Sequence, residues 1–200
     1  MLYQLSMTLK KLKSEISTCR ICVDFLPFAP NPVFRANERS RILIIGQAPG
    51  TKVHNTGIPW NDPSGDRLRS WLGVSSDEFY NEENISIIPM GFCYPGKGKS
   101  GDLPPRPECA PKWHDKLLKF LPNLRMTLLI GQYSQKYYLG NRMKENLTAT
   151  VQNFHEYLPD FFPLPHPSPR NTFWIQQHPW FAGEVIPVLK RKFHKILESI

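Results

Sequence analysis

The sequence has no run of about 18 consecutive apolar residues, so it lacks a segment typical of a membrane-spanning helix. Its first residues, MLYQLSMTLKKLKSEIS, mix lysines into the apolar positions and do not form the apolar core of a secretory signal. Cysteine is scarce, with 4 in 200 residues. We therefore expect a cytoplasmic protein with no membrane contact. In that reducing compartment its cysteines would be metal ligands, reactive thiols or buried side chains rather than disulfides.

Acidic residues are also few, because 17 Asp and Glu stand against 25 Lys and Arg, which gives a net charge of +8. A basic surface favours a polyanionic partner such as nucleic acid, and a solvated basic surface without a dedicated ligand is the alternative. The apolar share of 40% excludes an extended disordered chain. At this length we expect one domain over residues 1–200, and a monomer.

Three short apolar runs predict strands that are buried on both faces. They are RILII, ISIIPM and MTLLI, at residues 41–45, 85–90 and 126–130. Helical spacing of apolar residues predicts helices at 67–72, 111–121, 133–139 and 184–200, and a first helix whose apolar stripe is Leu5, Leu9, Leu12 and Ile16. Strands that alternate with helices predict an α/β fold with a largely parallel sheet.

Ligands of open α/β sheets bind beyond the carboxyl ends of the strands. The segments that follow the three strands are GQAPGTKVHNTGIPW, GFCYPGKGKSGDLPP and GQY. We expect these segments to converge on one site, together with the proline-rich run PLPHPSPRN.

The segment GQAPG allows a ligand to approach the backbone closely, because glycines stand at both of its ends, Gly46 and Gly50. A plain strand-to-loop turn is the alternative. Trp60 follows nearby and offers a flat ring on which a planar base could stack, although a tryptophan packed in the core is the default for this residue type.

The run HPSPRN places an imidazole, a hydroxyl, a guanidinium and an amide within six residues. Its prolines restrict the backbone, which helps to hold these polar groups in one arrangement. Such a loop suits contacts to phosphates and bases. A surface turn in which His166 caps a neighbouring element is the alternative.

The cysteines are spaced as a close pair, Cys19 and Cys22, followed by Cys93 and Cys109. Four thiolates brought together suit zinc or an iron–sulfur cluster, and the spacing does not distinguish them. In the alternative arrangement no metal is bound and Cys93 is buried at a strand end.

Taken together, GQAPG, the four cysteines, GQY and HPSPRN resemble the uracil-DNA glycosylase superfamily, and most of all its iron–sulfur class. The resemblance runs from Cys19 to about Phe181. It implies three layers, α/β/α, around a four-stranded, mostly parallel sheet, and a pocket for a base flipped out of the DNA. It also implies a [4Fe–4S] cluster, with zinc as the alternative cofactor.

The resemblance assigns roles to single residues of the two motifs. His166 would hydrogen-bond the carbonyl oxygen of the leaving base, and Trp60 stands where the family has a stacking Phe. The first motif would position water and line the base pocket through Gly46, Gln47, Ala48, Pro49 and Gly50. The loop that presses into DNA would be Pro167, Ser168, Arg170 and Asn171. The cluster ligands would be Cys19, Cys22, Cys93 and Cys109.

Three positions depart from the family pattern. At one position the founding branch has an aspartate that orients water. This chain has Ala48 there, and the iron–sulfur class also has an alanine. Pro89 stands where the iron–sulfur class reads the uracil edge with an asparagine, which leaves that recognition without a side-chain donor. His54 replaces a common acidic residue and is a candidate for orienting water or contacting phosphate, with Asn55 and Asp62 as further candidates.

We therefore expect an enzyme, a DNA-base glycosylase that removes uracil or a related damaged base from damaged or single-stranded DNA and leaves an abasic site. The first alternative is a nucleic-acid-binding relative that keeps the fold and lacks the chemistry. The second is a pocket for a free nucleotide or small metabolite.

Overall fold

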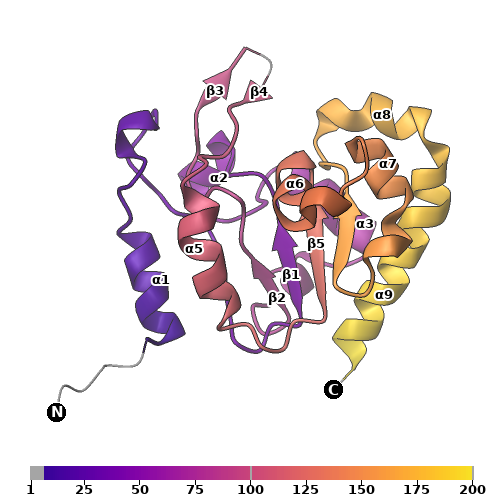
Figure 1. The fold of residues 1–200 in the computed structure, drawn as a ribbon, viewed down its shortest axis with the longest axis horizontal. Helices are drawn as coiled ribbons and strands as arrows, with labels where there is room; N and C mark the ends of the chain where they lie inside the picture. The colour runs from indigo at the N-terminus through magenta and orange to yellow at the C-terminus, as the bar shows by residue number, and fades with distance from the viewer. Residues whose placement is uncertain (1–6, 100, 200) are drawn as a thin grey trace.

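A computed structural model describes residues 7–99 and 101–199. Its centre is a four-stranded sheet with the order β2-β1-β5-β6, in which every neighbouring pair is parallel. The strands of this sheet are β1 (Ile42–Ile45), β2 (Ile85–Ile87), β5 (Met126–Ile130) and β6 (Phe161–Leu164), and a separate hairpin is formed by β3 (Lys97–Gly98) and β4 (Gly101–Asp102). The hairpin projects beyond the carboxyl ends of the sheet strands (Figure 1).

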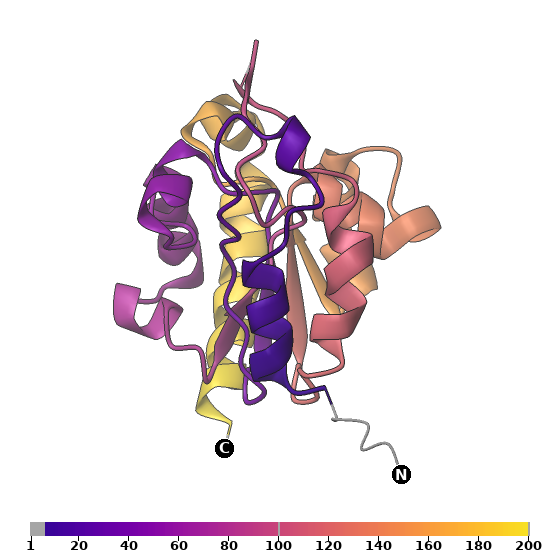
Figure 2. The ribbon, with the colours of Figure 1, turned by 90° about the vertical axis from the view of Figure 1, so that its left-hand side faces the viewer.

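Helices cover both faces of the sheet (Figures 1 and 2). The α-helices are α1 (Leu9–Ser17), α2 (Thr51–Thr56), α3 (Pro63–Leu72), α4 (Ser76–Phe79), α5 (Cys109–Leu118), α6 (Gln132–Leu139), α7 (Leu147–Gln152), α8 (Thr172–Gln177) and α9 (Ile186–Glu198). Shorter 3-10 turns span Val23–Phe25, Gly140–Arg142, Phe154–Tyr157 and Pro169–Asn171, and a π-helical turn, Phe181–Val185, precedes α9. None of the helices described is both long enough and apolar enough to span a bilayer.

The sheet separates two apolar cores because successive strand residues point to opposite faces. Ile42 and Ile44 of β1 pack with α3 and α9, whereas Leu43 and Ile45 pack with α1 and α5. All four of these side chains are fully buried. The three-layer α/β/α arrangement and the parallel sheet that we expect from the sequence are therefore confirmed.

The predicted strands at 41–45 and 126–130 agree with β1 and β5, and the regular part of β2 is shorter than predicted. Pro89 lies between two amides that still pair with the neighbouring segment: Ile88 donates to the Ile44 carbonyl at 3.0 Å and Met90 to the Gly46 carbonyl at 2.9 Å. The nitrogen of Pro89 therefore stands at a position from which no hydrogen bond to β1 is needed. The chain can continue alongside β1 to the cavity.

The residue pattern did not predict β6, which is the fourth strand of the sheet. Pro163 interrupts its apolar run, and the proline-rich run PLPHPSPRN that we expect at the site includes Pro163 and Leu164, the last two residues of β6. Because β6 is an edge strand, a proline whose nitrogen faces away from β5 costs no ladder hydrogen bond. The hairpin and the short helices α2, α4, α7 and α8 were also not predicted.

The predicted helices are present with shifted ends. The first begins at Leu9, where the Thr8 side chain accepts a hydrogen bond from the Lys11 amide at 3.2 Å, and Leu5 lies outside the described residues. Leu9, Leu12 and Ile16 are buried, as their spacing predicts. The last α-helix begins at Ile186 rather than 184, and Ile200 is also outside the described residues.

A buried histidine links α5 to the end of β2. The Nε2 atom of His114 lies 3.0 Å from the Pro89 carbonyl oxygen, and its Nδ1 atom lies 2.6 Å from the Tyr138 hydroxyl. A carbonyl oxygen can only accept, so Nε2 carries the proton and Nδ1 accepts from the tyrosine. Burial lowers the pKa of His114 from its ordinary value of 6.5 to about 4, which keeps the ring neutral.

This neutral histidine predicts a loss of stability in acid. Between pH 6.5 and 4 the unfolded chain binds a proton at His114 and the folded protein does not, so the free energy of unfolding falls as the pH falls. We expect His114 to account for roughly 3 kcal/mol of this fall, at about 1.4 kcal/mol for each pH unit. His114→Gln keeps an amide donor for Pro89 and does not titrate, so denaturant unfolding from pH 8 to 4 should show a shallower decline. An equal decline in the variant would contradict this.

Candidate active site

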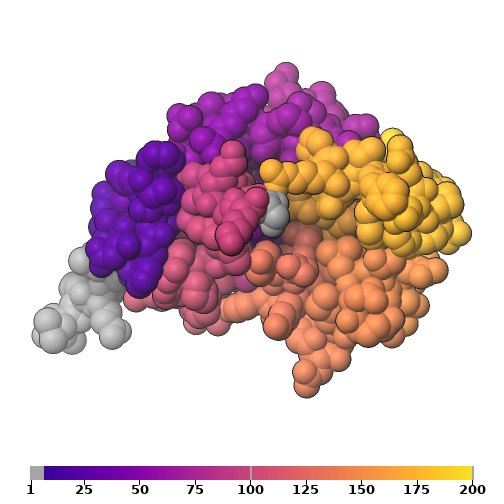
Figure 3. Space-filling view, turned by 90° about the horizontal axis from the view of Figure 1, so that it is seen from above, coloured from indigo at the N-terminus to yellow at the C-terminus, as the bar shows by residue number. Residues whose placement is uncertain are grey.

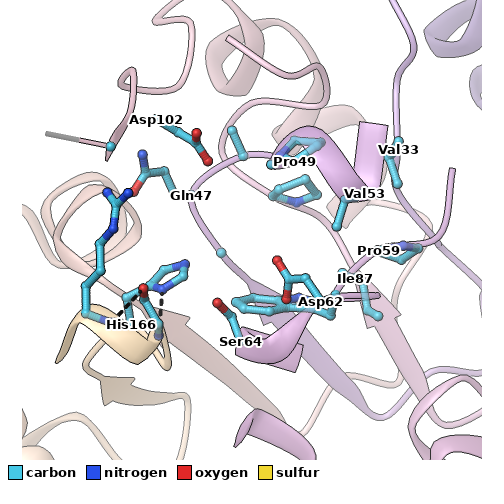
Figure 4. A pocket seen from close by; sticks show the side chains of 18 of the residues that line it. Val33, Gln47, Pro49, Val53, Pro59, Asp62, Ser64, Ile87, Asp102 and His166 are labelled. Atoms are coloured by element: carbon cyan, nitrogen blue, oxygen red, sulfur yellow. Dashed lines mark hydrogen bonds between the residues drawn. The ribbon is translucent and has the colours of Figure 1, made fainter. Parts of the chain in front are cut away.

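A cavity of about 450 Å³ lies beyond the carboxyl ends of β1 and β2 (Figure 4). Its walls come from the segment before β1, the loop after β1 with the adjoining α2, the stretch that leads into α3, the end of β2, the hairpin and the HPSPRN loop. The polar and glycine residues that line it are Gly46, Gln47, Gly50, Asp62, Ser64, Gly101, Asp102, His166, Ser168, Arg170 and Asn171. The remaining lining residues are Val33, Ala48, Pro49, Val53, Pro59, Trp60, Ile87 and Pro89.

The first motif forms one wall of this cavity with all five of its residues. The Gln47 side chain donates a hydrogen bond to the Leu103 carbonyl at 3.2 Å, which ties this loop to the hairpin. Gly46 leaves room for the indole of Trp60, because a Cβ atom at this position would lie 2.7 Å from the Trp60 ring. The glycine thus allows the Trp60 side chain to approach the backbone closely, whereas the sequence predicts the close approach of a ligand there.

Trp60 is held in a left-handed backbone conformation, with φ of 59°, which is unfavourable for a bulky residue. Its carbonyl oxygen lies over Gly65 in α3, where a Cβ atom would approach it to 1.7 Å. Arg69 also donates to that oxygen, at 3.3 Å. Strained residues persist where their surroundings fix them, and they concentrate at functional sites.

His166 faces the Trp60 ring, with 5.6 Å between the ring centroids and 33° between the planes. The Nδ1 atom of His166 accepts a hydrogen bond from the Ser168 amide at 3.2 Å. Burial lowers the pKa of His166, and the negative charge of Asp62 opposes this shift. The lowered pKa favours the neutral ring. Because Nδ1 accepts a hydrogen bond, the proton of the neutral ring is on Nε2, which can donate to a ligand.

The HPSPRN loop is fixed by hydrogen bonds from both of its sides. The Asn171 side chain donates to the His166 carbonyl at 2.7 Å. From α3, Arg67 donates to the Ser168 carbonyl at 3.0 Å and to the Thr172 hydroxyl at 3.1 Å. The loop can thus present His166 in one orientation without a bound ligand.

Two carboxylates lie at the cavity, although Ala48 supplies none (Figure 4). Asp62 caps α3 and accepts a hydrogen bond from the Gly65 amide at 2.9 Å. Asp102 comes from β4, and partial desolvation raises its pKa while the positive charges of Arg170 and Lys97 oppose the shift. No sequence motif marks Asp102, although it lies in a segment that the strand pattern brings to this site.

The structure does not bring three of the candidates to the cavity. His54 lies on another side of α2, where it stacks on Phe28 at 5.4 Å between ring centroids. Its neighbour Val53 faces the cavity, and successive helix residues point about 100° apart, so His54 is turned away. Asn55 and Pro167 are likewise absent from the lining.

The four cysteines come together around the start of α5. Cys19, Cys22, Cys93 and Cys109 all line a second, small cavity, and none forms a disulfide. Burial raises the pKa of Cys93 to about 11 and that of Cys109 to about 12. Among residues 7–99 and 101–199, no three Cys, His, Asp or Glu side chains are arranged to hold a metal ion.

Comparison with known proteins adds a family to this geometry. The sequence profile of the uracil DNA glycosylase superfamily matches residues 34–190. A type-4 uracil-DNA glycosylase from Sulfurisphaera tokodaii is 24% identical over 150 residues, which cover 72% of this chain and 64% of that protein. The chain thus matches less than two thirds of that relative's length.

A structural comparison finds the solution NMR structure of a candidate uracil DNA glycosylase from Methanosarcina acetivorans. The alignment covers 80% of this chain and 98% of that one, with 15% sequence identity and a TM-score of 0.47.

The close contact between Trp60 and Gly65 predicts that Gly65→Ala is disruptive. The added Cβ atom would overlap the Trp60 carbonyl, so α3 or the strained loop must move. We expect the free energy of unfolding to fall by about 1–3 kcal/mol, as for other overpacked sites, and tryptophan fluorescence to change. Chemical denaturation measures the first quantity.

Gly183→Ala is the matched control, because a Cβ atom there meets nothing within 4 Å. It should leave stability unchanged or raise it slightly. Equal stability of the two variants would show that Gly65 is not the constraint on Trp60.

Proposed function

The chain belongs to the uracil DNA glycosylase superfamily, and we propose that it is a DNA-base glycosylase that flips a base into the 450 Å³ cavity. The enzyme would hydrolyse the N-glycosidic bond of uracil or a related damaged base and leave an abasic site. The observation that carries this proposal is the contact between the His166 and Trp60 rings within one cavity, with Nδ1 of His166 held by the Ser168 amide.

His166 is the proposed catalytic donor to the leaving base. When the bond between C1′ of the sugar and the base nitrogen breaks, negative charge develops on the base, including its carbonyl oxygen. A fixed Nε2–H donor stabilises that charge without reorganising, because the Ser168 amide already holds the ring. Trp60 would stack on the face of the base.

Asp102 is the proposed acceptor for the proton of the attacking water. Oxygen of the water bonds to C1′, its proton passes to the Asp102 carboxylate, and the base leaves with the electron pair of the broken bond. Asp62 would stabilise the positive charge that develops on the sugar, since the Gly65 amide fixes its carboxylate at the cavity wall. Gln47 and Ala48 would shape the site of the attacking water. We do not propose that His54 orients this water, because its ring faces Phe28.

Base selection is where this chain departs furthest from the family pattern. Pro89 lines the cavity without a side-chain donor, and its carbonyl is already bonded to His114. Discrimination would therefore rest on Trp60, His166 and the backbone around Gly46, Pro49 and Gly50. We propose a substrate range that includes damaged bases other than uracil.

DNA would contact the rim of the cavity. Ser168, Arg170 and Asn171 lie there on the HPSPRN loop, and Pro167 restricts the backbone between them and His166. Exposed lysines of the hairpin, Lys97 and Lys99, extend the positive rim. The net charge of +8 is consistent with a phosphate-bearing partner.

We also propose that Cys19, Cys22, Cys93 and Cys109 hold a [4Fe–4S] cluster, with zinc as the alternative. Their shared cavity supports this, as four unpaired thiols suit either cofactor. The cluster would supply a cross-link between the loop after α1, the segment after β2 and the start of α5.

The glycosylase proposal predicts base release by the purified protein. Oligonucleotides that contain uracil, hypoxanthine or hydroxymethyluracil, single- and double-stranded, should yield abasic sites that alkali cleaves. His166→Ala should slow release on the order of 10²- to 10³-fold, because it removes a fixed donor to developing charge. Asp102→Asn should slow it on the order of 10²-fold, and Pro89→Asn should favour uracil over the other bases.

The outcomes of this assay separate three functions. Base release that depends on His166 supports the glycosylase. Tight binding of uracil-bearing or abasic DNA without release would identify a non-catalytic binding relative. DNA affinity that hardly changes with salt, again without release, would indicate a pocket for a small metabolite.

The cysteine proposal predicts a brown protein when purification excludes oxygen. Iron and sulfide analysis should give a cluster's content in the parent, and the double variant Cys19→Ser/Cys22→Ser should lose both. Zinc without iron would support the alternative cofactor. A parent protein with neither metal would contradict the proposal.

A further inference from the structure

Exposed apolar side chains gather beside the proposed site. Five of the nine large apolar residues that are exposed in the described chain lie in the loop after α1 or at the base of the hairpin. They are Ile21, Val23, Phe25, Phe28 and Leu103. An exposed apolar cluster of this kind marks an interaction surface more often than scattered single residues do.

Two of these residues present flat rings to solvent. Phe28 is 53% exposed and stacks on His54 at 5.4 Å and on Tyr94 at 6.1 Å, with interplanar angles of 28° and 20°. Tyr94 is buried and supports the stack from below. Phe25 is 59% exposed, and the Arg106 guanidinium lies 4.1 Å from its ring centroid.

This aromatic surface, defined by Phe25, Phe28 and His54, adjoins the cavity. Val53, the residue before His54, lines the cavity. The loop also packs on the hairpin that forms another cavity wall, since Pro27 lies 3.4 Å from the position of a Cβ atom on Gly96. Figures 2 and 3 show the loop and the hairpin side by side at the carboxyl end of the sheet.

The charges around the surface favour a polyanion. Arg20 and Lys52 are exposed beside it and Lys97 on the hairpin, whereas Asp24 is the acidic residue of the loop itself. Exposed rings flanked by cations are the elements with which proteins bind unpaired nucleic acid strands, because bases stack on rings and cations neutralise phosphates.

We propose that the aromatic surface is a stacking platform for unpaired bases that flank the flipped nucleotide. The proposal rests on the proposed function for its choice of DNA as partner. A duplex keeps its bases stacked on one another, so the platform would favour single-stranded or locally opened DNA over a closed duplex.

The test is the binding of fluorescently labelled DNA without any damaged base, measured by anisotropy at one salt concentration. A single-stranded oligothymidylate is compared with a blunt duplex of equal length. We expect Phe28→Ala to weaken binding of the single strand on the order of tenfold and to leave duplex binding nearly unchanged. Phe28→Trp should restore or increase single-strand affinity, because it keeps a ring.

Tyr137→Ala is the matched control, since Tyr137 is an aromatic residue that is 42% exposed on α6, outside both the aromatic surface and the HPSPRN loop. It should bind the single strand as the parent does, and unfolding midpoints should show that all variants are folded. Unchanged single-strand binding by Phe28→Ala, or equal losses on both DNAs, would overturn the platform. Self-association of the parent that Phe28→Ala abolishes would instead make the surface a contact between two copies and would also overturn it.

The two proposals can fail separately in these measurements. Single-strand binding that depends on Phe28, without release of any base, would keep the platform and refute the glycosylase. Base release by the parent, together with single-strand binding that Phe28→Ala does not change, would support the glycosylase proposal and contradict the platform proposal.

Discussion

Parallel pairing of β1 between β2 and β5 is the constraint on which the site depends. Ile42 is in register with Ile85 on one side and Met126 on the other, so the three strands end at one edge. The loops that line the cavity therefore start from a common level of the sheet. Burial of β1 on both faces fixes this register, because a slip of one residue would exchange the side chains that belong to the two cores.

The same constraint explains what the sequence could predict. β1 and β5 are continuous apolar runs that end in glycine, and they form where the pattern places them. Strands that contain proline were harder: Pro163 concealed β6, although an edge strand tolerates it. At the site, the order of the motifs along the chain singled out Trp60 and His166. Their separation in the sequence does not predict that the two rings lie 5.6 Å apart.

Residues whose positions depend on tertiary structure could not be predicted in this way. His54 belongs to a polar loop in the sequence, but that segment folds as α2 and turns the ring toward Phe28. Asp102 reaches the cavity because the β3–β4 hairpin brings it there. The paired strand, Lys97–Gly98, has no apolar pattern from which a strand could be predicted. Neither outcome follows from local propensity, since both depend on which segments pack beside them.

Helix α5 connects the two parts of the molecule that the sequence treats as separate motifs. Cys109 begins this helix, and His114, little more than a turn later, donates to the Pro89 carbonyl at the cavity. Phe92 joins the same network, as its amide donates to the Cys109 sulfur at 3.3 Å and its ring stacks on His114 at 5.8 Å. Any cofactor held by the cysteines would therefore be connected to the cavity wall through the packed side chains of Phe92 and His114. The structural effect of such a cofactor would then reach the cavity itself.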